Sequence, residues 1–197
     1  QSLCYITGVM EYNTYSHAKR LRGNMDNAKL ISANDDKGYT FRGRFTDDTG
    51  LQACGIGFDV SQKAHNTLRW LIARQGWQNE DLAFVAWAVS GADIPKLMAD
   101  TSALFKGKKI ETPLRKSDSA KDIGEKLSKL LAEYTVNLKP RDNVVVMGLN
   151  SATPGRMAVI YYRELAGSDF LARIQVWHQH CTWLQRFSEK KRFIGAP

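Results

Sequence analysis

The feature that most constrains the fold is a continuous apolar run, LAFVAWAV, at residues 82–89. An uninterrupted apolar run of this length, ending at the turn signal Ser90-Gly91, is typical of a strand that is buried on both faces. Such a strand needs neighbours on either side. We therefore expect the chain to fold around a sheet in which residues 82–89 form a central strand.

Periodic patterns elsewhere predict helices and further strands. Helical spacing of apolar residues indicates helices at 59–76, 94–105, 119–136 and 168–187, and β-branched or aromatic runs indicate strands at 143–149 and 156–165, with a turn-rich loop at 150–155. From residue 82 the order is strand, helix, strand, strand, helix. That order is typical of a split βαβ unit, so a ferredoxin-like arrangement is one option.

Two of these helices carry predictions about their ends and faces. Asp59 or Ser61 is expected to cap the first helix, and Gly76 to take the left-handed conformation after its end. Ser168 is expected to cap the last helix. The residues expected on the buried face of the first helix are Ala64, Leu68, Leu71 and Ile72, and on that of the last are Phe170, Ile174, Trp177, Cys181 and Leu184.

The N-terminal part contains the stretch YTFRGRF at residues 39–45, in which aromatic residues alternate with other types. With strands expected at 2–7 and 28–34, a loop at 9–27 and a turn at 35–38, it indicates the returning strand of a hairpin. Alternation then places the aromatic residues of this stretch in the core, and Arg42 and Arg44 together on the opposite face.

These predictions define an α+β fold, with a small β-rich N-terminal part followed by a mixed α/β unit. We expect a β-hairpin-rich basic subdomain at 1–58 and an α+β subdomain at 59–197. The chain begins without Met at a strand-like stretch and stops at FIGAP. Both ends therefore suggest an internal part of a longer protein.

Charge favours a polyanionic partner. The chain has 197 residues with 28 Lys and Arg against 20 Asp and Glu, a net charge of +8. Such an excess favours nucleic acid or an anionic surface. Three widely spaced cysteines argue against a disulfide framework, and no apolar run approaches the ~20 residues of a membrane span. We therefore expect a cytoplasmic protein without a membrane partner.

Catalytic and metal-binding patterns are weak in this sequence. WHQHC at 177–181 offers two possible ligands on one helix face, and the favoured interpretation is a buried Cys181 with histidines on the surface. The adjacent aspartate pairs lie in expected turns, and neither a GxSxG elbow nor a Walker A pattern is present. We expect no catalytic residue, no metal and no cofactor.

Basic residues in expected loops and on the outer face of 39–45 are the candidates for nucleic-acid contact. Their long side chains could reach phosphates, and Arg or Asn could read base edges. The alternative for each basic run is an ordinary solvated face. The candidates are Lys19, Arg20, Arg22, Arg42, Arg44, Lys106, Lys108, Lys109, Asn150 and Arg156.

Several stretches occur in order over nearly the whole chain: CYITG, AKLISAND, GYTFRGRF, KAHNTLRWLIARQGW, VAWAVSGADIP, ATPGRMAVIYYREL and RFIGAP. This ordered set resembles the Csd-one family, the large subunit of the type I-C CRISPR surveillance complex, Cascade. The segment 9–22 departs from the family pattern, because His17-Ala18-Lys19 stands where the family has His-Pro-Lys.

The resemblance implies a non-catalytic protein of antiviral defence, with target DNA and CRISPR RNA (crRNA) as partners beside other Cascade subunits. Large subunits of this kind sit at the crRNA 5′ end, recognise the protospacer-adjacent motif (PAM), guide the displaced strand and recruit the helicase-nuclease. Guide pairing then does most of the sequence reading. Two alternatives remain, a pure protein–protein scaffold and a nuclease.

Overall fold

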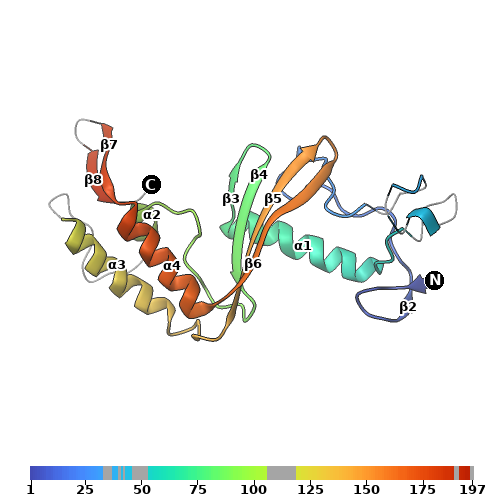
Figure 1. Cartoon of the computed structure of the whole chain (residues 1–197), viewed down its shortest axis with the longest axis horizontal. Helices are drawn as coiled ribbons and strands as arrows, with labels where there is room; N and C mark the ends of the chain where they lie inside the picture. Colours follow the sequence, from blue (N-terminus) through green and yellow to red (C-terminus); the bar gives the residue numbers. More distant parts are fainter. Residues whose placement is uncertain are drawn as a thin grey trace. The chain divides into compact units, whose positions relative to one another are not determined.

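The computed structural model describes residues 1–32, 37–39, 41, 43–45, 53–105, 119–188 and 191–195. The chain divides into two compact units, which are described separately below. Unit 1 consists of Gln1–Ala83 and Gly148–Tyr161, and unit 2 of Phe84–Met147 and Tyr162–Pro197. Helices and strands are both present, so the α+β prediction is confirmed (Figure 1). The boundary predicted at residue 58 stays a prediction.

The main sheet has four strands in the order β3-β4-β5-β6. They are β3 (Trp77–Asn79), β4 (Leu82–Ala88), β5 (Asn143–Thr153) and β6 (Arg156–Ala166). Two-residue turns join β3 to β4 and β5 to β6, which makes both pairs antiparallel hairpins. The central strand predicted at 82–89 is confirmed. The strands lie in the sheet in their chain order, with residues 89–142 connecting β4 to β5, so this is not the split βαβ arrangement of a ferredoxin-like fold.

Helix α1 (Phe58–Gln75) forms the core of unit 1 together with the N-terminal segment. Its buried residues are Ser61, His65, Leu68, Leu71 and Ile72. The predicted helix is confirmed, but neither predicted cap is found. The N-cap is Gly57 without a side-chain cap, and Gly76 has an extended backbone, with φ −70° and ψ 157°. Gly76 is still required sterically, because a Cβ there would lie 2.6 Å from the Ile72 carbonyl oxygen.

The N-terminal segment of unit 1 contains less strand than predicted. Among its described residues, β1 (Ser2–Leu3) pairs with β2 (Met10–Glu11), Asn13 makes an isolated bridge to Gly57, and Lys29 makes a single bridge where a strand was expected at 28–34. Gly43–Phe45 is a 3-10 turn, so the described part of 39–45 is not a strand. An isolated two-stranded hairpin is marginal in water, whereas a 3-10 turn satisfies its hydrogen bonds locally.

Unit 2 packs α3 (Ala120–Tyr134) and α4 (Gly167–His180) around a core of Leu, Val and Phe side chains, with the short α2 (Thr101–Phe105) beside them. Figure 1 shows α3 and α4 side by side, and Gln175 Nε2 donates to Ser128 Oγ across them at 3.0 Å. A reciprocal capping box between Ser119 and Asp122 starts α3.

The C-terminal part of unit 2 corrects several predictions. Helix α4 ends at His180, and β7 (Trp183–Ser188) pairs with β8 (Lys191–Gly195) where a continuous helix was expected. The N-cap of α4 is Ala166, so Ser168 does not cap it. The histidine prediction was also wrong in part, because His178 is buried and its Nδ1 lies 3.0 Å from Thr101 Oγ1, whereas Cys181 is only half-buried.

Candidate nucleic-acid interface

The basic loop of unit 1, defined as residues 17–29, is held by its backbone. Arg69 on α1 donates from Nε to the Arg20 carbonyl at 3.0 Å and from Nη2 to the Lys19 carbonyl at 2.9 Å. Arg20 N–H donates to the Asp26 carbonyl at 2.9 Å, and Arg20 takes the left-handed conformation with φ 64°. The backbone polar groups therefore face inward, and the side chains of Lys19 and Arg20 are exposed.

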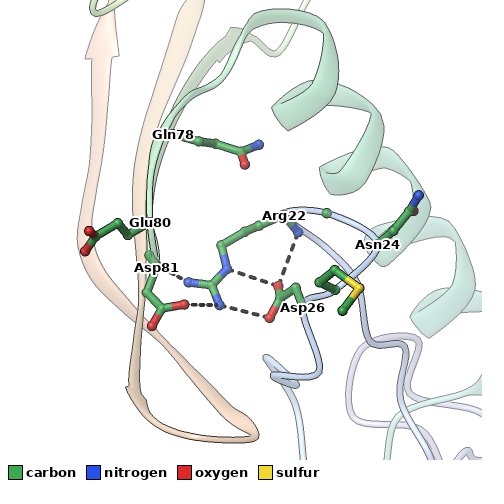
Figure 2. Close-up of a pocket in the computed structure, with 8 residues that line it drawn as sticks. Arg22, Asn24, Asp26, Gln78, Glu80 and Asp81 are labelled. Atoms are coloured by element: carbon green, nitrogen blue, oxygen red, sulfur yellow. Dashed lines mark hydrogen bonds and ion pairs between the residues drawn. The ribbon is translucent and has the colours of Figure 1, made fainter.

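Arg22 anchors the same loop from inside, as Figure 2 shows. Its Nε and Nη2 donate to the two carboxylate oxygens of Asp26 at 3.0 and 2.9 Å. Nη1 donates to the Asp81 carbonyl in the β3–β4 turn, and Nη2 donates to Ser151 Oγ on β5 at 2.6 Å. One guanidinium therefore ties the basic loop to two hairpins of the sheet.

The charges of this anchor stabilise one another. Hydrogen bonding to Asp26 raises the pKa of Arg22. Burial raises the pKa of Asp26, but hydrogen bonds from Arg22 and from the Ala28 backbone N–H outweigh it and leave the pKa below its ordinary value. The side chains of Arg22 and Asp26 are only 5% and 9% exposed. Arg22 is therefore committed to internal partners and is not presented to a ligand in this conformation.

Two shallow cavities flank the anchor. One, of about 400 Å³, is lined by the loop and the β3–β4 turn, including Gln78 and Glu80. The other, of about 330 Å³, reaches the β5–β6 turn at Pro154 and Gly155. Glu80 and Asp81 give the first cavity an acidic side, which makes it a poor phosphate site. The exposed cations of the loop, rather than these cavities, are the features suited to a polyanion.

The end of the basic loop joins the β5–β6 hairpin. Lys29 N–H donates to the Gly155 carbonyl at 3.0 Å, and Met157 N–H donates to the Lys29 carbonyl at 2.9 Å. These bonds make a parallel bridge between Lys29 and Arg156. Arg156 is exposed, while Lys29 is half-buried and its Nζ donates to Ser16 Oγ at 3.4 Å. Sequence reasoning did not select Lys29, because its position beside Arg156 depends on this non-local pairing.

The predicted contact residues fall into distinct groups. Lys19 and Arg20 lie on the basic loop, and Arg156 lies on the hairpin to which that loop is bonded. Arg44 is exposed on the 3-10 turn, and Asn150 is half-buried on β5. Outside the described residues lie Arg42, Lys106, Lys108 and Lys109.

His17, the first residue of the basic loop, forms a buried pair with His65 of α1. His17 Nδ1 lies 2.8 Å from Ser61 Oγ, and His65 Nδ1 lies 2.7 Å from the Ser61 carbonyl oxygen, with the two rings 5.8 Å apart. Both Nε2 atoms are buried without a hydrogen-bond partner among the described residues. Burial, with smaller effects of His65 and Lys29, lowers the pKa of His17 to about 4. Burial therefore favours the neutral imidazole of His17 in the folded chain.

No group of three or more His, Cys, Asp or Glu side chains is placed to hold a metal ion within the described part of the chain. None of the helices in the described ranges is long and apolar enough to cross a membrane.

Comparison with protein-family models identifies a family for the chain. The family model described as CRISPR-associated protein (Cas_Csd1) matches residues 1–197, the full length of the chain. No curated protein matches the chain.

Proposed function

Because the chain belongs to the CRISPR-associated protein family Cas_Csd1, we propose that it is a non-catalytic part of the large subunit of the type I-C surveillance complex, Cascade. In this proposal the basic loop of unit 1 contacts nucleic-acid phosphates near the PAM and helps to guide the DNA strands. The sequence of the target is read mainly by the guide RNA.

The observation that carries the proposal is the way in which the basic loop is fixed. Its backbone is bonded to α1 and to β6, and Arg22 ties it to the β3–β4 turn and to β5. Lys19, Arg20 and Arg156 are exposed around this fixed backbone. Cations held on an ordered scaffold lose less conformational freedom when they bind phosphates, because the backbone that carries them is already ordered.

The proposed partners follow from the family. They are target DNA, crRNA, the other Cascade subunits and the helicase-nuclease that Cascade recruits, and the proposed location is the cytoplasm. The net charge of +8 supports a polyanionic partner but does not distinguish DNA from RNA.

The test is DNA binding by the triple variant Lys19→Ala, Arg20→Ala and Arg156→Ala, measured by fluorescence anisotropy. The matched control removes three exposed cations from unit 2, Lys121→Ala, Lys129→Ala and Arg173→Ala, and so lowers the net charge equally. We expect the first variant to lose at least tenfold in affinity at about 0.1 M salt and the control to lose much less. Equal losses would show that net charge, not the basic loop, governs binding.

Adding Mg²⁺ or Mn²⁺ to the same mixtures tests the non-catalytic part of the proposal. Cleavage of the DNA by the purified chain would contradict it, provided that the cleavage is lost in a variant of the chain and therefore does not come from a contaminant.

A second candidate function is a scaffold that docks to neighbouring subunits without touching nucleic acid. The observation that favours it is the β1–β2 hairpin of unit 1, where Ile6, Val9 and Met10 are 56–66% exposed. Exposed apolar groups of this kind often mark protein interfaces. Replacing all three with Ser should abolish assembly if docking is the sole role of the chain, whereas DNA binding by the isolated chain should stay unchanged.

A further inference from the structure

Phe45, at the end of the 3-10 turn Gly43–Phe45, forms an exposed aromatic pair with Phe41, and the proposed phosphate contacts do not use this pair. Phe41 and Phe45 are 75% and 71% exposed, and their rings meet edge to face with centroids 5.1 Å apart. The sequence pattern had predicted both side chains in the core. Their exposure corrects that prediction and leaves ring surface open to solvent.

A cation adjoins the aromatic pair. Arg44 directly precedes Phe45 in the 3-10 turn and is itself exposed. Gly38, at φ 74°, packs against it, since a Cβ at Gly38 would lie 3.4 Å from Arg44 Cγ. The glycine therefore leaves room for the stem of Arg44 beside the turn. Exposed rings together with a neighbouring exposed arginine are the combination that single-strand binding proteins use, with bases on the rings and phosphates on the cation.

We propose that Phe41, Phe45 and Arg44 form a binding site for unpaired nucleotides of single-stranded DNA. The phenylalanine rings stack on exposed bases, and Arg44 contacts the adjacent phosphate. This inference rests on the proposed function, because pairing between guide RNA and one DNA strand leaves the other strand unpaired.

The charge of Arg44 and the exposed rings of Phe41 and Phe45 together favour single-stranded DNA as the ligand. A purely apolar protein partner gains nothing from Arg44 at the edge of the pair, whereas a phosphodiester backbone is attracted to it and to the net charge of +8. In a duplex the base faces are covered by neighbouring bases. The rings can therefore stack only on unpaired bases, and the strand left unpaired by guide pairing makes single-stranded DNA the expected ligand.

The test compares the double variants Phe41→Leu with Phe45→Leu, and Phe41→Tyr with Phe45→Tyr. Leucine keeps an apolar side chain without a π-face, and tyrosine keeps the ring. The probes are an oligothymidine of about 15 nucleotides, a duplex of equal length and an oligouridine of equal length. A Trp177→Leu variant, which removes a 46% exposed ring from unit 2, is the matched control. Urea denaturation confirms that each variant folds.

We expect the leucine variant to bind oligothymidine about tenfold more weakly, and the tyrosine and Trp177→Leu variants to stay within about twofold of the unmodified chain. Duplex binding should be unchanged in all of them. A larger loss on oligouridine than on oligothymidine would assign the site to RNA, and an equal loss would show that the site does not distinguish the two. Either result overturns the choice of DNA.

The failure of this inference is distinguishable from the failure of the proposed function. Unchanged oligothymidine binding by the leucine variant overturns the stacking site, while the loss expected from Lys19→Ala, Arg20→Ala and Arg156→Ala would leave the phosphate contacts standing. If the leucine variant binds normally but no longer assembles with the other subunits, the rings belong to a protein interface and the inference is wrong.

Discussion

At the scale of single residues, Arg22 shows how one cation can serve structure rather than binding. It donates to Asp26, the Asp81 carbonyl and Ser151, and its side chain is only 5% exposed. The sequence placed it in one basic run with Lys19 and Arg20. Nothing in that run distinguishes a buried arginine from an exposed one, because its partners Asp81 and Ser151 are 59 and 129 residues away.

Removing this anchor should destabilise the chain strongly. Arg22→Ala leaves the Asp26 carboxylate buried without its cation, so we expect a loss of about 3 kcal/mol in the free energy of unfolding, measured by urea denaturation. Arg20→Ala is the control, since its side chain is exposed and should change stability by less than about 0.5 kcal/mol. A loss below about 1 kcal/mol for Arg22→Ala would show that the anchor is dispensable.

The buried His17 makes stability depend on pH. Its pKa is about 4 in the folded chain and near 6.5 when exposed. Between these values the unfolded chain binds a proton that the folded chain does not, so stability falls as the pH is lowered through this window.

Urea denaturation of the unmodified chain and of His17→Asn, at pH values from 7 to 4, measures this effect. The unmodified chain should lose up to about 3 kcal/mol more than the variant over that interval, because Asn cannot take up a proton. Parallel curves for the two proteins would remove His17 as the cause.

At the scale of elements, strongly periodic segments were predictable and locally ambiguous ones were not. Helix α1, helix α3 and strand β4 follow from apolar spacing or from an unbroken apolar run, and each is found within a few residues of its predicted bounds. Alternation at 39–45 was misleading, because a strand also needs a partner for its backbone. The predicted continuation of the helix after α4 was wrong for the converse reason. These residues form β7, and the backbone pairing of β7 with β8 outweighs their helical pattern.

The capping box of α3 is a local feature whose removal has a defined cost. Ser119 Oγ accepts from Asp122 N–H at 3.2 Å, and Asp122 accepts from Ser119 N–H at 2.8 Å. Ser119→Ala should lower the free energy of unfolding by about 1 kcal/mol, measured by thermal or urea denaturation. Lys121→Ala, at an exposed position in the same turn, is the control and should be nearly neutral. Equal effects of the two substitutions would mean that the cap contributes nothing.

At the scale of the whole molecule, a nucleic-acid partner could be predicted from the sequence, but the surface that would contact it could not. Net charge and the family resemblance both pointed to nucleic acid, and the family is confirmed by the match over residues 1–197. The candidate interface depends on contacts between distant segments, such as Arg69 with Lys19 and Lys29 with Gly155. Those contacts join the segments that carry Lys19, Arg20 and Arg156. These three exposed residues are therefore chosen from the other cations as the candidate interface.

The most direct test of this account is the salt dependence of duplex DNA binding. Each phosphate contact contributes about −0.9 to the slope of log K against log salt concentration. The triple variant Lys19→Ala, Arg20→Ala and Arg156→Ala should therefore flatten the slope by about 2 to 3, while the matched unit 2 variant leaves it nearly unchanged. An unaltered slope in the triple variant, with the fold intact, would contradict the assignment of phosphate contacts to the basic loop.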